Sequence, residues 1–286
     1  MFVPCDSGLY LLSMNKSRFR FGISTTVDYS VPIETQLDII SSCHFDFISI
    51  GANLNHSRFL DRAHFSAVIV RAKTMGLPVE SVHAPYAGKY DLASAPTEAR
   101  ERALEGICEF LNMSSVYGIP LVILHPHHYF ADSKEACLDR IVRSLEKLDM
   151  LRPDGVEIAL ENLPGKESSW IFSSLMKIFD PAKFGFCYDS SHENISGEPF
   201  HLIGKFHDRL TTTHLSDNHG QNDDHLIPGE GIIDWGALKQ YILKAVWLED
   251  ILFEVGTGEK LGEPLEQFVR RAADRAREIF AGENDS

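Results

Sequence analysis

The chain has 286 residues, of which 44% are apolar and 24% are charged, and its formal net charge is −14 at pH 7. This composition is ordinary for a globular protein with a large core, and the negative charge argues against a broad basic surface for nucleic acid. No apolar stretch approaches the ~18 residues that a membrane span requires, so we expect no membrane partner.

The chain is expected to form one domain over residues 1–286, because no Pro-, Gly- or Ser-rich linker divides it. Residues 1–17 are interpreted as an N-terminal extension, and Met14 is an alternative start. The extension has an apolar patch but no basic region and no clear cleavage site, so a signal peptide is not predicted. Five cysteines without a CxxC motif indicate reduced packing thiols in a cytoplasmic protein.

Short apolar runs bounded by turn residues predict eight buried parallel strands. We place them at residues 18–24, 45–51, 79–84, 120–126, 156–162, 184–190, 210–216 and 250–255. Segments with helical spacing of apolar residues lie at 33–43, 60–75, 97–117, 134–150, 168–179, 235–246 and 263–281. Thr97, Ser133 and Asp234 are expected to cap three of these helices. Strands that alternate with helices predict an α/β fold, a single (β/α)8 TIM barrel.

Six of the predicted strands carry, near their C-terminal ends, a side chain that can bind a metal ion. These residues are His83, His125, Glu161, Asp189, His214 and Glu254. The C-terminal strand ends of a (β/α)8 barrel converge on one face, so residues far apart in sequence surround one pocket. Imidazoles and carboxylates gathered there are typical ligands of a divalent ion such as Zn2+, Mn2+ or Co2+.

Four of these candidates also have a purely structural explanation. Glu161 and Glu254 could each form a buried ion pair with an arginine, since carboxylates are rarely buried unpaired. Asp189 could cap the turn after its strand. His83 could be a core histidine that is hydrogen-bonded to a main-chain carbonyl.

The stretch richest in ligand-type side chains follows the seventh strand, with the sequence HLSDNHGQNDDHLIPGEG over residues 214–231. Its glycines and proline predict a loop over the barrel mouth, and three histidines are more than a solvated loop requires. In an extended backbone, Asp223 and His225 point the same way, as a pair suited to a metal or to a phosphate-bearing substrate. By contrast, His127 and His128, in the sequence HPHH, are expected to be solvated loop histidines.

From Phe19 to the last helix, the motifs HAPY, ALEN, YDSSH, HLSDN, DDHLIPGEGIIDW and FEVG resemble those of the xylose isomerase-like TIM-barrel superfamily. This superfamily contains sugar isomerases and epimerases and also the endonuclease IV branch. In its ketose epimerases, one Mn2+, Co2+ or Zn2+ is bound at positions that match Glu161, Asp189, His214 and Glu254. In endonuclease IV, three zinc ions use these four positions and others that match His83, His125, His192, Asp223 and His225. All nine are present, so the resemblance leaves one metal or a cluster open.

The resemblance implies a metal-dependent isomerase or epimerase of a small sugar or sugar phosphate. Glu161 and Glu254 would serve as base and acid through an enediolate that the metal stabilises, and His192 would hydrogen-bond a substrate oxygen. The alternative is an endonuclease IV-like zinc-dependent phosphodiesterase or hydrolase. A noncatalytic binding protein is disfavoured because no ligand position is lost.

Three sequence features favour sugar chemistry over DNA cleavage. The segment SIGANLNHSRFL has one arginine where endonuclease IV carries a basic and aromatic segment. The sequence HPHH replaces HPG, and the ending GEGIIDW is more usual in the sugar enzymes. The arginine that follows the strand-seven histidine of the epimerases is missing, with Gly220 in its neighbourhood. We therefore expect a small-molecule sugar substrate, while the identity of the sugar and the oligomeric state, including a homo-oligomer, are left open.

Overall fold

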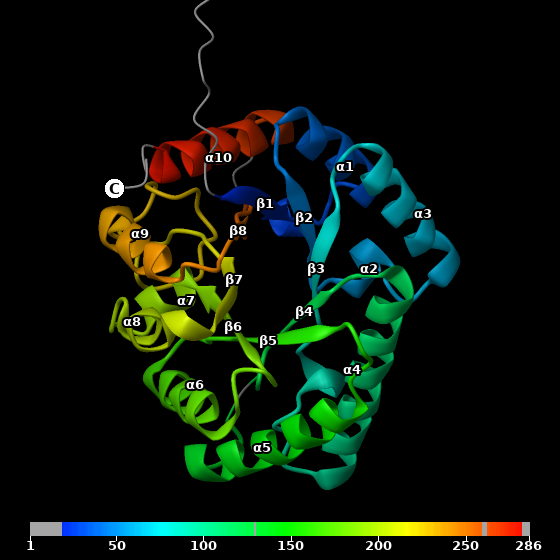
Figure 1. Cartoon of the computed structure of the whole chain (residues 1–286), viewed down its shortest axis with the longest axis vertical. Coiled ribbons are helices and arrows are strands. Elements are labelled where there is room, and N and C mark those ends of the chain that lie inside the picture. The colour runs from blue at the N-terminus through cyan, green and yellow to red at the C-terminus, as the bar shows by residue number, and fades with distance from the viewer. Residues whose placement is uncertain (1–18, 129, 259–261, 282–286) are drawn as a thin grey trace, which may run out of the picture.

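The computed structural model describes residues 19–128, 130–258 and 262–281, so the predicted extension at 1–17 lies outside the described residues. Eight parallel strands curl into a nearly closed barrel with helices around it (Figure 1), as predicted. The strands are β1 (Arg20–Ser24), β2 (Phe47–Ile50), β3 (Val79–His83), β4 (Leu121–Leu124), β5 (Glu157–Glu161), β6 (Gly185–Asp189), β7 (Leu210–His214) and β8 (Asp250–Phe253). Their order in the sheet is β7-β6-β5-β4-β3-β2-β1-β8.

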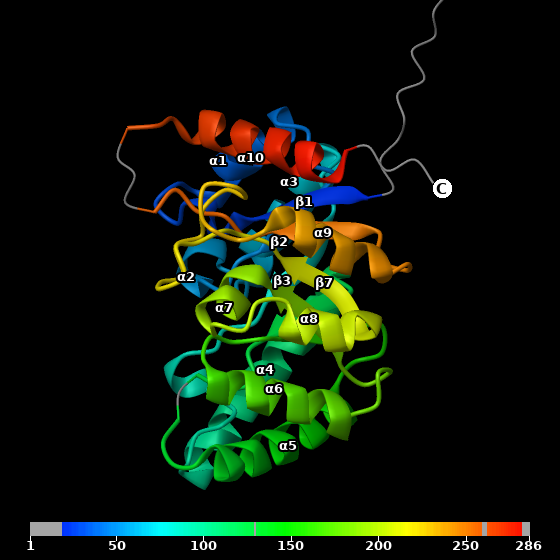
Figure 2. The same ribbon diagram turned by 90° about the vertical axis from the view of Figure 1, so that its left-hand side faces the viewer.

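The helices are α1 (Ile33–Ser42), α2 (Leu54–Ser57), α3 (Arg62–Thr74), α4 (Thr97–Tyr117), α5 (Lys134–Leu151), α6 (Lys166–Ile178), α7 (Ser190–Ile195), α8 (His201–Phe206), α9 (Trp235–Lys244) and α10 (Leu265–Phe280). In Figure 2, α1, α3 and α10 lie at one end of the molecule and α5 and α6 at the other, with the strands between them. None of the described helices is both long and apolar enough to cross a membrane. The described cysteines, namely Cys43, Cys108, Cys137 and Cys187, are free thiols, as predicted.

Two of the three predicted helix caps are confirmed. Ser133 and Asp234 each accept a hydrogen bond from a main-chain N–H three residues later, at 3.2 and 2.9 Å. The third prediction was wrong, because Thr97 is the first residue of α4 and Pro96 occupies the cap position. Pro96 has an extended backbone with φ −66° and ψ 127°, so the helix begins only after it.

The segment between β6 and β7 contains two short helices, α7 and α8, that the sequence analysis did not predict. The Asp189 side chain caps α7, since its Oδ1 accepts from the N–H of His192 at 2.6 Å. The buried carboxylate of Glu193 accepts from the N–H of Leu202 in α8. Each helix has only six residues and rests on these tertiary contacts, so helical spacing of apolar residues could not identify them.

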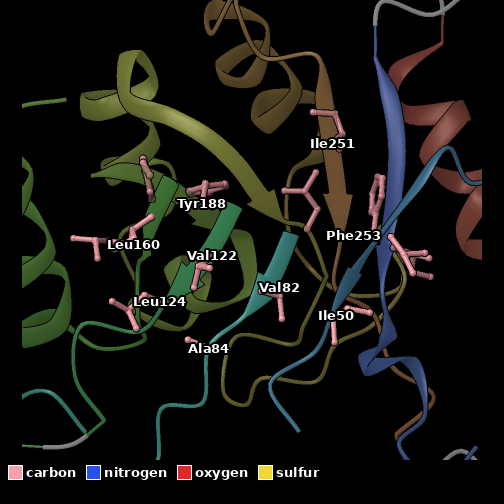
Figure 3. Packing of buried hydrophobic residues seen from close by; sticks show 14 of the residues in the cluster. Ile50, Val82, Ala84, Val122, Leu124, Leu160, Tyr188, Ile251 and Phe253 are labelled. Carbon is pink, nitrogen blue, oxygen red and sulfur yellow. The ribbon is translucent and has the colours of Figure 1, made fainter. Parts of the chain in front are cut away.

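Side chains along each strand alternate between the two faces of the barrel wall. Figure 3 shows residues of the main core, including Val82, Val122, Leu160 and Phe253, which belong to the same buried cluster as residues of the surrounding helices. A separate cluster of strand residues forms the barrel interior, made of Phe47, Ile123, Ala159, Cys187 and Leu252.

The alternation carries the predicted ligands into the barrel interior. Glu161, Asp189 and Glu254 each lie two residues after an interior residue, and His125 does the same after β4. In the sheet register, His83 pairs with Ile123 and His214 pairs with Asp189, so these two histidines face the same side. The sequence thus places six potential ligands at the C-terminal end of one interior layer.

The barrel closes between β7 and β8 through few main-chain contacts. The described residues form one isolated bridge there, between Leu215 and Phe253. The Thr213 hydroxyl adds two hydrogen bonds of 3.0 Å, one donated to the carbonyl of Leu252 and one accepted from its N–H. The Thr213 side chain therefore adds to two main-chain hydrogen bonds at the β7–β8 seam, from the N–H of Leu215 to the carbonyl of Leu252 at 3.0 Å and from the N–H of Glu254 to the carbonyl of Leu215 at 3.1 Å.

Candidate metal centre

The structure brings all nine predicted ligand residues to the C-terminal end of the barrel, where they form three adjoining groups. They are His83, His125, Glu161, Asp189, His192, His214, Asp223, His225 and Glu254. The members that come from strand ends are largely buried, whereas Asp223 and His225, from the loop after β7, are partly exposed. The centre therefore has a buried floor and a more open rim.

The first group, which we call the main group, consists of Glu161, Asp189, His214 and Glu254, whose ligand atoms lie within 4.8 Å of one another. Nδ1 of His214 lies 3.1 Å from Oε2 of Glu161 and 3.0 Å from Oε2 of Glu254. Among the described residues, no hydrogen bond reaches Oδ2 of Asp189, either oxygen of Glu161 or either ring nitrogen of His214. Buried polar atoms normally have a hydrogen-bond partner, so several buried oxygen and nitrogen atoms without one, directed at the same point, fit a bound cation.

The second group consists of His83, His125 and Glu161. The two Nε2 atoms lie 3.2 Å apart, and they lie 3.2 and 3.3 Å from Oε2 of Glu161. Glu161 therefore belongs to two groups. Its ionic contacts within the described chain are to histidines, which argues against the alternative of a buried arginine pair.

The third group consists of His192, Asp223 and His225. Oδ2 of Asp223 lies 3.1 Å from Nε2 of each histidine. His225 has a positive φ of 47°, an uncommon backbone for a residue other than glycine, and this conformation belongs to the loop that covers the mouth. Asp223 and His225 are thus close together as predicted, with His192 as an additional partner, but the backbone at His225 is left-handed and not extended as the prediction assumed.

Asp217, another acid of this loop, has a structural role. Its carboxylate is fully buried and accepts hydrogen bonds from the N–H of Gly229 at 2.8 Å, the N–H of Ile233 at 3.1 Å and Nε1–H of Trp235 at 2.8 Å. These contacts tie both ends of the loop to one point. Asp217 therefore holds in place the segment that carries Asp223 and His225.

Three of the histidines are oriented by main-chain carbonyls. Nδ1 of His83 lies 2.7 Å from the main-chain oxygen of Ala84. Nδ1 of His192 lies 2.9 Å from that of Asn162, and Nδ1 of His225 lies 3.0 Å from that of Glu254. A carbonyl oxygen only accepts, so Nδ1 carries the proton and Nε2 faces the centre. The alternative explanation of His83, a histidine bonded to a carbonyl, therefore holds together with its place in the centre, as is usual for metal-binding histidines.

Burial and neighbouring charges act in opposite directions on the carboxyl groups. Burial raises the pKa of Glu161, but the imidazoles of His214 and His125 lower it by more and hold it well below its usual range. The same balance, dominated by His214, lowers the pKa of Glu254 to about 2. For Asp189 burial prevails over His192, and the pKa is raised to about 7.

A cavity of about 400 Å³ opens above the centre, a size suited to a small ligand. Its described lining includes Thr26, Asp28, Tyr29 and Tyr86, which the sequence analysis did not single out, and it includes no lysine or arginine. The Tyr86 ring stacks on that of His125 at 4.1 Å between centroids. Tyr86 is the last residue of the motif HAPY, so its place three residues after His83 was the available signal.

The prediction for His127 was wrong, whereas His128 is exposed as predicted. His127 is only 4% exposed and packs against Phe130, with 4.9 Å between ring centroids. Burial lowers its pKa to about 4. The N–H of His128 donates to Oδ1 of Asp91 at 3.3 Å, a contact between distant segments that shapes this loop and that sequence alone does not reveal.

Among known proteins, y4fM of Sinorhizobium fredii, described as uncharacterized, is 24% identical over 254 residues, which are 79% of this chain and 82% of that protein. The "Probable endonuclease 4" of Aquifex aeolicus is 26% identical over 222 residues, covering 69% of this chain and 77% of the relative. That of Geotalea daltonii is 32% identical, but over 114 residues, 37% of this chain and 40% of the relative.

Several solved structures share the fold at low sequence identity. A D-psicose 3-epimerase crystallised with D-fructose superposes with a TM-score of 0.77 at 14% identity, covering 92% of this chain and 100% of that one. An IOLI protein with a bound zinc atom gives 0.77 at 15% identity, covering 92% and 98%. These likenesses establish the fold alone. The family described as xylose isomerase-like TIM barrel matches residues 37–279, and the chain belongs to that family.

Proposed function

We propose that this protein is a divalent-metal-dependent isomerase or epimerase of a small sugar or sugar phosphate. Glu161, Asp189, His214 and Glu254 would hold the ion, which is Mn2+, Co2+ or Zn2+. Three carboxylates and one imidazole form a donor set that suits these ions. The solved epimerases of the same fold and the zinc-containing neighbour support this proposal.

The observation that carries the proposal is the position of two ionised glutamates at the floor of a small cavity. Glu161 and Glu254 both line the cavity, and each has a carboxylate oxygen within 3.1 Å of Nδ1 of His214. Their pKa values are lowered, so both are carboxylates at neutral pH and either can accept a proton. The pair therefore supplies a proton acceptor and, after transfer, a proton donor to one substrate.

The reaction would consist of proton removal from one carbon of the sugar and proton return. A divalent ion bound by the main group would supply positive charge that makes the C–H beside a substrate carbonyl more acidic. This is needed because the two carboxylates are weak bases. One glutamate takes the proton, and the same glutamate can return it to the neighbouring carbon. Return to the opposite face requires that the other glutamate first accept a proton from water and that the first release its proton to water. The rings of Tyr29 and Tyr86, neutral because burial raises their pKa values, would offer hydroxyl groups and apolar faces to the sugar.

The direct test is solvent exchange. The enzyme, loaded with Mn2+, Co2+ or Zn2+, is incubated in heavy water with D-fructose, D-tagatose, D-psicose and their phosphates, and proton NMR reports deuterium beside the carbonyl. We expect exchange at one carbon and its loss in Glu161→Gln or Glu254→Gln, whichever variant lacks the glutamate that removes the proton. Exchange should be retained in Glu249→Gln, because Glu249 is an exposed acid outside the cavity. Absence of exchange with every pair of metal and sugar would contradict the proposal.

A second candidate, an endonuclease IV-like zinc-dependent phosphodiesterase, is favoured by one specific observation. Glu161 is shared between the main group and the histidine pair His83 and His125, an arrangement that suits neighbouring ions. Several relatives bear the name endonuclease 4. We rank this function second because the described cavity lining contains no lysine or arginine for a phosphate chain. Salt-sensitive cleavage of DNA at abasic sites, without any deuterium uptake into sugars, would reverse the ranking.

A further inference from the structure

Asn162 follows the ligand candidate Glu161 directly, and its side chain is completely buried. Its Nδ2 donates to the main-chain oxygen of Asp189 at 2.9 Å, and its Oδ1 accepts from the main-chain N–H of Asp189 at 2.8 Å. The amide thus pairs with both main-chain groups of one residue, as a neighbouring strand would. The pairing of β5 with β6 ends at Glu161 and Cys187, and this side chain continues it as far as Asp189.

The main chain of Asn162 holds a second residue of the centre. Its carbonyl oxygen accepts from Nδ1 of His192 at 2.9 Å, which leaves Nε2 to face Asp223. Between these two contacts, Oδ1 of Asp189 accepts from the N–H of His192 at 2.6 Å. Oδ2 of Asp189 is thereby left for the main group, where no other described residue satisfies it.

We propose that Asn162 is a positioning residue that sets the direction of the Asp189 carboxylate and thereby governs how tightly the main group binds a divalent ion. Without the amide, the N–H of Asp189 loses its partner and the carbonyl of Asp189 loses one hydrogen bond, so the backbone that aims Oδ2 at the centre is less firmly held. Groups that orient metal ligands typically change metal affinity by ~10- to 100-fold when they are removed. The inference rests on the proposed metal centre and does not depend on the identity of the substrate.

The test compares Asn162→Ala with Asn218→Ala, using Zn2+ alone as the probe in competition with a chelator. Asn218 is equally buried, and its Nδ2 also donates to a main-chain carbonyl at 2.9 Å, that of Ser191, which is not a ligand candidate. Both variants lose a buried amide and are expected to lose thermal stability in the metal-free state. We expect zinc affinity to fall by ~10- to 100-fold in Asn162→Ala and to stay near the wild-type value in Asn218→Ala.

Equal zinc affinities in the two alanine variants would show that Asn162 supports only the fold, and would overturn the inference. If Asn162→Ala does not fold, Asn162→Asp replaces it, because this variant keeps the acceptor for the N–H of Asp189 and removes the donor to its carbonyl. Wild-type affinity in Asn162→Asp would overturn the inference equally. A wild-type protein that binds no zinc would contradict the metal centre itself, so the two failures are distinguishable.

Discussion

Oε2 of Glu161 and Nδ1 of His214 lie 3.1 Å apart, although the two residues end β5 and β7, which are separated in the sheet by β6. Each side chain is 1% exposed. Because Glu161 also contacts His83 and His125, this pair lies where two ligand groups meet. The first three predictions concern this meeting point.

Removal of a main-group ligand should abolish tight metal binding. We expect Asp189→Ala to reduce zinc affinity by at least the ~100-fold upper range for groups that merely orient ligands, because Oδ2 itself is lost. Asp154→Ala is the control, since Asp154 is exposed in a turn between α5 and β5. Elemental analysis and chelator competition measure the effect, and equal affinities in the two variants would contradict the assignment.

Substitution of either glutamate by glutamine should separate metal binding from proton transfer. In Glu161→Gln and Glu254→Gln, the amide oxygen can still coordinate a metal, but the side chain can no longer exchange a proton. General acid-base groups contribute ~10²- to 10⁴-fold to rates, so isomerisation should fall at least that far while appreciable metal remains. A variant with full metal content and wild-type exchange in heavy water would rule out that glutamate as the base or acid.

The histidine pair decides whether the centre holds more than one ion. If a second ion binds there, His83→Ala should lower the zinc content by about one equivalent and leave the main group loaded. His201→Ala is a suitable control, because His201 is an exposed histidine on α8. Unchanged stoichiometry in His83→Ala, measured on protein saturated with zinc, would favour a single ion.

Metal affinity should rise with pH, because a bound ion must replace protons on its ligands. Burial lowers the pKa of His214, but Cys187, Glu254 and Glu161 raise it by more, to well above its usual value, so a binding ion must displace a proton from this ring. Asp189, with a pKa of about 7, releases another below pH 7. Affinity should therefore rise with pH, and more steeply below pH 7 than above it. In Asp189→Asn the extra steepness below pH 7 should vanish, and a uniform slope in the wild type would contradict the scheme.

Thr213→Val should destabilise the fold without touching a ligand. The change keeps the shape of the side chain but removes both hydrogen bonds to Leu252. The carbonyl of Leu252 still accepts from the N–H of Leu215, whereas the buried N–H of Leu252 loses its partner, which costs about 1–3 kcal/mol. Thr211→Val is the comparison, since the hydroxyl of Thr211 makes only a long contact of 3.4 Å with the carbonyl of Arg209. Urea unfolding of the two variants measures the difference, and equal stability losses would show that the seam does not depend on Thr213.

The fold was predictable because two periodicities are strong in this sequence. Apolar runs mark all eight strands, and the period of two within a strand determines that Glu161 and Asp189 share the interior with Ala159 and Cys187. The gathering of the nine candidate ligands followed from that placement and from the family motifs. The roles of the individual residues stay predictions.

The parts that could not be predicted depend on contacts between distant segments. The helices α7 and α8 exist through the side chains of Asp189 and Glu193, and no spacing of apolar residues announces them. His127 is buried by its surroundings, although its immediate neighbours resemble a solvated turn. The two hydrogen bonds between Asn162 and Asp189 depend on the register of β5 against β6, which is set by the closed barrel.

A bound ion would have a mechanical role as well as a chemical one, because β7 and β8 are only weakly paired with each other. His214 ends β7 and Glu254 follows β8, and Nδ1 of His214 lies 3.0 Å from Oε2 of Glu254 across that seam. An ion held by both side chains would act as a coordinate crosslink between the two sheet edges. Removing it should accelerate amide hydrogen exchange along β7 and β8 while strands far from the seam, such as β3 and β4, stay protected. Metal loading would then be a step in completing the barrel.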